Sequence, residues 1–264
     1  MLEAISESGA SSWLTSLPIA KYGFHLDKCS FQDALCLRYN FELHRLPLNC
    51  ICGATYTTAH AISCTRGGFT IIRHNDIRDV TAEMLREVCH DVAAEPVLSP
   101  LSGESFICKT ANLNEDARCD VSARGFWRKA SKAFVDVRVF NPLAKSNFSK
   151  SLEVLYRGNE QAKKREYSER ILQVEHGTFT PLVFSTFGGM GREATVFYKR
   201  LNAALAEKKN INESVCMSFI RTRLSFSLLR NLLMCLRGTR SKRAMSISDT
   251  DIPMAIVETE QKSG

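Results

Sequence analysis

Hydrophobic and polar positions alternate along residues 119–126 and 133–140, and both stretches carry β-branched or aromatic residues. This pattern predicts two β-strands. The basic, polar residues 127–132 between them predict a hairpin connection. A further strand is expected at 95–98, and the apolar run at 180–186 predicts a fourth strand of the buried type.

Apolar residues at helical spacing predict five helices. These are expected at 31–41 with Ser30 as the N-cap, 75–90, 149–174 with Gly177 as the C-cap, 193–208, and 214–236. From residue 75 onward the order is helix, three strands, helix, strand and two helices. This order predicts an α/β fold with a mixed sheet flanked by helices.

Positive charge is concentrated in one part of the chain. The whole chain has a formal net charge of +7, and residues 118–170 alone hold 13 Lys and Arg against 6 Asp and Glu, a surplus of +7. A localised surplus favours binding to a polyanion or an anionic surface. The alternative is a solvated helix face that carries charge for solubility.

Four potential metal ligands lie within fifteen residues. Cys50, Cys52, His60 and Cys64 form the pattern Cys-x-Cys-x₇-His-x₃-Cys, and Gly53 permits a sharp turn beside the second cysteine. Thiolate and imidazole ligands suit structural Zn²⁺, so the pattern predicts a zinc site. The alternative is three buried or idle thiols and a core histidine.

Two carboxylates are predicted to meet on adjacent strands. Asp120 and Asp136 each lie in or beside one of the expected paired strands, and such a pair can bind a hard divalent cation such as Mg²⁺. Arg138 would share a strand face with Asp136 and can stabilise charge but cannot accept a proton. A strand-end or turn role is the alternative for Asp120.

The charged helix that follows offers Lys163, Lys164 and Tyr167 as further catalytic candidates. Tyr167 lies one turn from both lysines and on the same helix face. The alternative for the lysines is surface solubility. A third acid is expected from one of Glu83, Glu87 and Glu95, between which periodicity does not choose.

Basic residues elsewhere are candidates for nucleic-acid contact. Arg73 and His74 are expected at the start of the helix at 75–90, where a helix N-terminus attracts a phosphate. Capping by Asn75 and ordinary surface charge explain the same residues equally well. The other candidates are the basic residues of the hairpin and its second strand, namely Arg128, Lys129, Lys132 and Arg138.

These residues together resemble a known family. The motifs are Cys50-x-Cys52…His60…Cys64, Gly67-Gly68, Arg73-His74-Asn75-x-Ile77-Arg78, Glu95-Pro96, Cys119-Asp120-Val121, Val135-Asp136-Val137-Arg138-Val139 and Lys163-Lys164-x-x-Tyr167. Over residues 45–240 the chain is similar to the C-terminal part of non-LTR retrotransposon proteins. In that part a CCHC zinc knuckle precedes a restriction-like (PD-(D/E)xK) endonuclease domain.

The resemblance implies a nuclease that nicks target DNA so that the exposed 3′ end can prime reverse transcription. It implies metal binding by Asp120 and Asp136, and a catalytic or DNA-contacting lysine at Lys163 or Lys164. Cys119 stands where the family has proline, and Arg138 replaces the lysine of its acid-x-Lys motif. Catalysis would therefore depend on the lysines of the helix.

The sequence contains no Tyr-x-Asp-Asp polymerase centre. The chain is therefore expected to be a fragment, a decayed copy or a separately encoded endonuclease part. Its expected partners are DNA, with RNA as the alternative, and a reverse transcriptase domain encoded elsewhere. The expected organisation is an N-terminal helical linker (1–48), the CCHC zinc knuckle (49–68), a restriction-like endonuclease domain (69–237) and a disordered tail (238–264).

The expected location is intracellular and nuclear. The chain has ten cysteines but no basic, apolar secretory leader, and it has no apolar run of about 20 residues. Residues 237–243 (RGTRSKR) resemble a nuclear address. Three functions compete: a Mg²⁺-dependent DNA endonuclease, a nucleic-acid-binding module with a catalytically dead nuclease fold, and an interaction scaffold with a structural zinc.

Overall fold

The computed structural model describes residues 2–99 and 117–240. Residues 100–116 and most of the tail expected at 238–264 lie outside the described residues. The helices are α1 (Leu2–Ile5), α2 (Lys28–Tyr39), α3 (Thr58–Ser63), α4 (Phe69–Arg86), α5 (Leu152–Gln173), α6 (Arg192–Lys209) and α7 (Glu213–Arg237), with short 3-10 turns at Ala20–Tyr22 and Lys145–Asn147. The strands are β1 (His90–Ala94), β2 (Val121–Arg124), β3 (Lys132–Phe140) and β4 (Thr178–Ser185).

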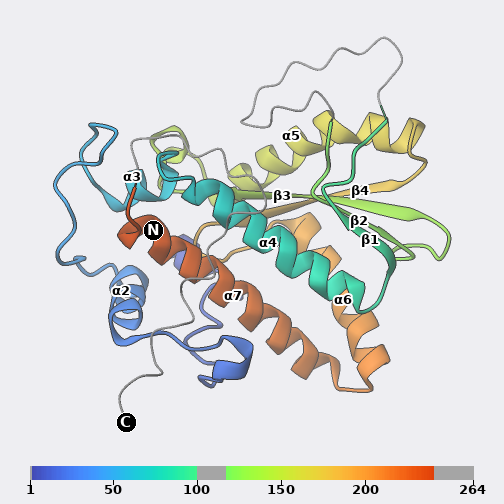
Figure 1. Cartoon of the computed structure of the whole chain (residues 1–264), viewed down its shortest axis with the longest axis horizontal. Coiled ribbons are helices and arrows are strands. Elements are labelled where there is room, and N and C mark those ends of the chain that lie inside the picture. The colour runs from blue at the N-terminus through green and yellow to red at the C-terminus, as the bar shows by residue number, and fades with distance from the viewer. Residues whose placement is uncertain (1, 100–116, 241–264) are drawn as a thin grey trace, which may run out of the picture.

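The described strands form one four-stranded mixed sheet in the order β1-β2-β3-β4. β2 is antiparallel to both β1 and β3, as expected for a hairpin between β2 and β3. β4 runs parallel to β3. A parallel return needs a long crossover, and α5 supplies it across one face of the sheet (Figure 1). The structure confirms the predicted α/β class, with a mixed sheet and flanking helices. The restriction-endonuclease-like fold remains a prediction.

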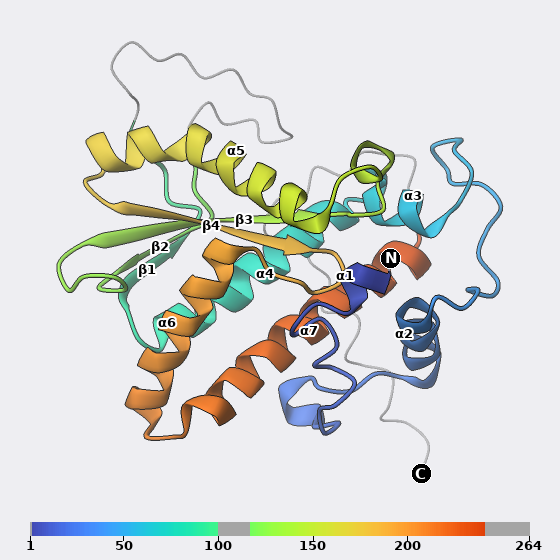
Figure 2. The same ribbon diagram turned by 180° about the vertical axis from the view of Figure 1, so that it is seen from behind.

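The alternation along β3 divides its side chains between two helical layers. Val135 and Val137 are buried in the core formed with α4, α6 and α7. Phe134 faces the other way and is buried with Tyr167 and Ile171 of α5. Asp136 has the same parity as Phe134 and is therefore directed to the α5 side. Figure 2 shows α5 on one side of the sheet, with α4, α6 and α7 on the other.

A second hydrophobic core lies along the C-terminal half of α7. It includes Trp13 and Phe24 from the N-terminal segment, Leu37 of α2 and Ile62 of α3. Leu232 of α7 is buried among them at 2% exposure. The Cys/His segment is thus packed into the body of the molecule through α3. No helix in the described ranges is both long and apolar enough to cross a membrane.

Three of the expected boundaries are wrong. α4 begins at Phe69 instead of residue 75, because Gly67 and Gly68 adopt positive φ angles of 88° and 70° and turn the chain into the helix. The expected strand at 95–98 is replaced by β1, which ends at Ala94. Asp27, not Ser30, caps α2, because its carboxylate accepts the free N–H groups of the first turn. The other predicted helices and strands lie within a few residues of the expected bounds, with Val174 as the C-cap of α5 three residues before Gly177. The short helices α1 and α3 were not predicted.

Candidate functional sites

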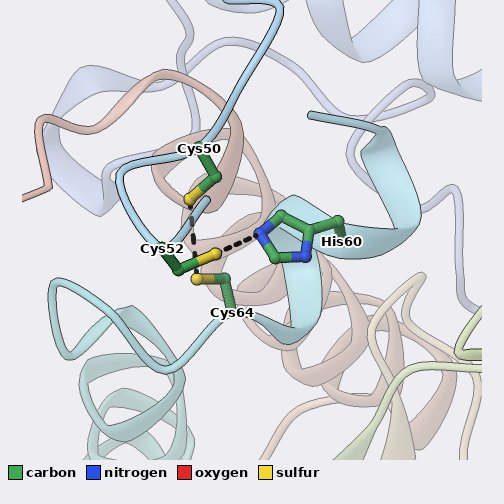
Figure 3. Close-up of side chains that lie close together, drawn as sticks. All are labelled: Cys50, Cys52, His60 and Cys64. Atoms are coloured by element: carbon green, nitrogen blue, oxygen red, sulfur yellow. Dashed lines mark hydrogen bonds between the residues drawn. The ribbon is translucent and has the colours of Figure 1, made fainter. Parts of the chain in front are cut away.

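The four predicted zinc ligands converge on one point (Figure 3). Their ligand atoms all lie within 4.8 Å of one another. Cys50 Sγ is 3.7 Å from Cys64 Sγ, and Cys52 Sγ is 3.3 Å from His60 Nε2. A group of this kind could hold a metal ion, and three sulfur ligands with one imidazole suit zinc.

Local backbone geometry explains this convergence. The Gly53 N–H donates to the Cys50 carbonyl at 2.8 Å, and Gly53 has a φ of 90°, which closes a tight turn around Cys52. Thr57 caps the N-terminus of α3 by accepting from the His60 N–H at 3.1 Å. α3 therefore carries His60 in its first turn, and Cys64 follows the helix directly as its C-cap.

The charge state of Cys50 also suits metal binding. Burial raises the pKa of its thiol, but hydrogen bonds from the Cys52 backbone, from His60 and from the neighbouring thiols outweigh burial and lower the pKa to about 6. The opposite holds for Cys64, where burial and the nearby Cys50 raise the pKa. The thiolate is the form that binds metal, so Cys50 is prepared for coordination at neutral pH.

The β2–β3 register brings the two predicted acids to facing positions. Val121 pairs with Val135, so the next position beyond β2 puts Asp120 opposite Asp136. Asp120 Oδ2 accepts a hydrogen bond from the Val137 N–H at 2.5 Å. The carboxylate thus satisfies a backbone donor of β3 that lies beyond the end of β2. Asp120 Oδ1 is 2.8 Å from His74 Nε2 of α4.

Asp136 is the buried member of the pair, at 3% exposure. Its Oδ2 atom is 2.9 Å from Lys163 Nζ, which reaches it from α5. Lys163 Nζ also lies 3.5 Å from Glu166 Oε2 and 5.3 Å from the centre of the Tyr167 ring. The structure therefore brings Asp120, Asp136, Lys163 and Tyr167 into one cluster with His74, which we call the acidic site.

The pKa shifts show how strongly these charges interact. Burial, followed by repulsion from Asp120, raises the pKa of Asp136 to about 7. Burial lowers the pKa of Lys163, but attraction to Asp136 outweighs it and the pKa is raised overall. For His74, burial is likewise outweighed by its hydrogen bond to Asp120, so its pKa is raised and protonation is favoured. Each of the two crowded carboxylates thus has a basic partner, Lys163 for Asp136 and His74 for Asp120.

Several predicted site residues lie elsewhere. Lys164 pairs with Glu193 at 2.5 Å instead of facing the acids. Arg73 was expected at a helix start, but it lies in the second turn of α4, is 4% exposed, and donates to the Ile62 carbonyl at 3.2 Å. The phosphate grip predicted for a helix N-terminus at Arg73 and His74 is therefore wrong in its geometry, because Arg73 is buried and His74 binds Asp120.

The basic residues of the hairpin are separated from the acids. Arg128 and Lys129 are exposed in the β2–β3 turn, and Lys132 is half-buried beside it. Lys132 is four residues along β3 from Asp136, a separation of about 13 Å at ~3.3 Å per residue. Arg138, also predicted to contact nucleic acid, is exposed and lies two residues from Asp136 on the same strand.

The three candidate third acids are all engaged in ion pairs. Glu83 pairs with Arg223. Glu87 is 2.5 Å from Lys209. Glu95 pairs with Arg78. Each glutamate thus has a basic partner that balances its charge. The residue that lies beside Asp120 is His74, not a third acid.

The two sites are joined through α3, a link that the sequence analysis missed. Asn141, just after β3, donates its amide to the Ala59 carbonyl at 3.0 Å and to Ser63 Oγ at 2.8 Å. Arg73, adjacent to His74, donates to the Ile62 carbonyl of the same helix. α3 therefore holds both β3 and α4. The only sequence signal at Asn141 is its position before Pro142, which indicates a strand end but no contact.

Comparison with models of known protein families gives no match, and comparison with curated proteins gives none either. The resemblance to retrotransposon endonucleases therefore rests on the motifs alone and remains a prediction.

We expect the full chain to bind one zinc ion per molecule and the Cys64→Ser variant to lose it. The thermal midpoint of the variant should fall by about 10 °C, because loss of ~3 kcal/mol gives a shift of that order in a protein of this size. Zinc content by metal analysis and unfolding followed by circular dichroism measure both effects. Cys29→Ser, at an exposed cysteine outside the cluster, is the matched control. Equal zinc content in the two variants would refute the site.

Without divalent cations, the Asp136 carboxyl should make stability depend on pH. Its pKa is raised in the folded state from 3.8 to about 7. The folded state therefore binds the Asp136 proton more tightly than the unfolded state does. The contribution of Asp136 to the free energy of unfolding is lost as the pH rises from 3.8 to about 7. The stability of Asp136→Asn relative to the original chain should increase from pH 5 to pH 8 in urea titrations.

Asp91→Asn, which changes an exposed acid, provides the control for this titration. Its stability relative to the original chain should vary little over the same interval. A constant difference between the original chain and Asp136→Asn at every pH would contradict the raised pKa.

Proposed function

We propose that this protein is a Mg²⁺-dependent DNA endonuclease with a restriction-endonuclease-like arrangement of its sheet and helices and a zinc-binding knuckle. The observation that carries the proposal is the acidic site, where Asp120 and Asp136 face each other at a strand end and Lys163 contacts Asp136 at 2.9 Å. Phosphodiester hydrolysis requires paired oxygen ligands for a metal and a cation near the developing charge.

The chemistry of the two acids fits a divalent cation. Burial and repulsion from Asp120 both raise the pKa of Asp136, so the two carboxylates lie close enough to act on one ion. Asp120 and Asp136 would hold the Mg²⁺ ion, because hard cations prefer carboxylate oxygens. When bound, the ion would polarise the phosphate and lower the pKa of a bound water.

The protein residues around the acids have distinct roles in this proposal. Lys163 keeps its proton and provides positive charge for the phosphate oxygens. His74 is a positioning residue that holds the Asp120 carboxylate through its Nε2 atom at 2.8 Å. The buried Tyr167 ring lies 5.3 Å from Lys163 Nζ and restricts the position of the ammonium group. Arg138 is exposed near the acids and offers a contact to the DNA backbone.

The proposed substrate is a DNA target that is nicked during insertion of a retroelement, which places the protein in the nucleus. RNA is a second possible nucleic-acid partner, and the reverse transcriptase would be encoded elsewhere. The surplus of positive charge in residues 118–170 supports binding to such polyanions.

A second candidate function is nucleic-acid binding without cleavage. The observation that favours it is the Lys163–Asp136 ion pair at 2.9 Å, which already neutralises a carboxylate that the metal would need. Arg138 in place of the acid-x-Lys lysine points the same way. This alternative requires DNA affinity that falls steeply with salt and no cleavage with any divalent ion.

For the nuclease, Asp136→Asn should abolish nicking of supercoiled plasmid by the full chain in Mg²⁺, with a loss of about 100-fold or more. DNA affinity should be unchanged or higher, because the substitution removes a negative charge near the phosphate. Agarose gel assays and binding titrations measure the two quantities. Nicking by the variant at the original rate would rule out Asp136 as a ligand, and absence of nicking by the original chain would favour the binding module.

The neighbouring lysines provide a matched pair. Lys163→Met should reduce the nicking rate by about 100-fold, because it removes the cation beside Asp136. Lys164→Met should change it by less than about threefold, because Lys164 pairs with Glu193 away from the acids. Single-turnover rates under the same conditions compare the two variants. Equal losses would contradict the assignment of Lys163 as the active-site cation.

A further inference from the structure

A groove lies between α2 and the C-terminal half of α7. Its volume is about 820 Å³, within the ~300–1,000 Å³ typical of ligand sites. Its lining comes from α2, from the segment that precedes the knuckle and from α7, namely Cys29, Ser30, Gln32, Asp33, Cys36, His44, Arg45, Arg230, Leu233, Met234 and Arg237. Neither the acidic site nor the Cys/His cluster contributes to this lining.

The charge of this groove is predominantly positive. Three arginines line it against one carboxylate, Asp33. Arg237 pairs with Asp33 through two contacts of 2.6 and 2.7 Å. The positive charges of Arg45 and Arg230 are therefore not balanced by a carboxylate of the lining. Arg230 donates to the carbonyls of Gly23 and His25, which are neutral. Among the described residues, no carboxylate forms a salt bridge with Arg45 or Arg230.

Two exposed aromatic rings follow the α2 lining residues in the chain, on the way to the lining residue His44. The α2 residues that line it recur at helical spacing up to Cys36, and Tyr39 continues this row one turn further. Tyr39 is 53% exposed and Phe41 is 65% exposed, with ring centroids 5.9 Å apart. Phe41 lies between Tyr39 and the lining residue His44 in the chain. Their faces are open to solvent, so each ring could stack on an unpaired base.

We propose that this groove binds single-stranded nucleic acid, with Arg45 and Arg230 on the phosphates and Tyr39 and Phe41 stacked on bases. A positively charged groove with adjoining aromatic rings is the arrangement that binds unpaired strands with little dependence on sequence. Duplex DNA keeps its bases stacked inside, so it would gain from the arginines but not from the rings. The groove is separate from the acidic site, and its binding requires neither Mg²⁺ nor cleavage.

The test measures binding of the full chain to fluorescently labelled 15-nucleotide oligo(dT) and oligo(U) by anisotropy, in buffer without added divalent ions. The double variant Tyr39→Ala/Phe41→Ala should raise the Kd at least tenfold, because each lost base stack weakens binding. Arg45→Ala should raise the Kd about threefold and reduce the salt dependence by about 0.7 in log–log slope, the value for one phosphate contact on a single strand.

Matched controls are Phe148→Ala, at a ring that is 84% exposed outside the groove lining, and Lys199→Ala, at an exposed lysine of α6. Both should bind within about twofold of the original chain. If the alanine double variant unfolds, Tyr39→Leu/Phe41→Leu keeps apolar bulk and removes only the aromatic faces, and it should show the same loss. Inorganic polyphosphate of equal charge should compete poorly with the oligonucleotide.

The inference is overturned if the ring variants bind as tightly as the original chain, or if polyphosphate competes as well as the oligonucleotide. Unchanged binding by the ring variants together with Mg²⁺-dependent nicking would refute the groove alone. Weakened binding by these variants without any nicking would refute the nuclease alone.

Discussion

The structure depends on keeping two carboxylates together at the point where β2 begins and β3 continues. Burying a charge costs several kcal/mol unless it is paired, and repulsion between like charges adds to the cost. Lys163 reaches Asp136 from α5 on one side, and His74 reaches Asp120 from α4 on the other. The sheet is therefore held between helices from its two layers at its most highly charged point.

α3 connects this charged point to the Cys/His cluster. It carries His60 of the cluster, accepts a hydrogen bond from Arg73 beside His74, and accepts others from Asn141 at the end of β3. Its Ile62 is fully buried against α7 in the second core. A metal bound to the cluster would fix α3, and through it the relative positions of α4 and β3. The knuckle is thus part of the architecture of the acidic site as well as a separate binding element.

Periodicity and spacing predicted the parts of this arrangement that depend on local sequence. The two-residue alternation around Asp136 predicts its strand correctly, and the spacing of Cys50 to Cys64 predicts a converging ligand group. Contacts between distant segments could not be predicted in the same way. Lys163 and Lys164 are equivalent by composition, and only the rotation of α5 on the sheet directs the first to Asp136 and the second to Glu193.

The role of His74 shows the same limit. His74 was predicted to contact a phosphate because it lay near an expected helix start. Gly67 and Gly68 instead place the start of α4 at Phe69, and the His74 imidazole contacts Asp120. The groove beside Arg45 was also not foreseen, because it forms between α2 and α7, about two hundred residues apart in the chain. Tertiary packing, not local preference, decides which residue His74 contacts and where the groove forms.

The most direct test of the paired acids is anomalous diffraction from crystals soaked in Mn²⁺, a cation that carboxylate oxygens bind much as they bind Mg²⁺. We expect one anomalous peak between Asp120 and Asp136, within about 2.0–2.6 Å of an oxygen of each. A map with no peak there, and with Lys163 still in contact with Asp136, would contradict the claim that these two carboxylates form a metal site.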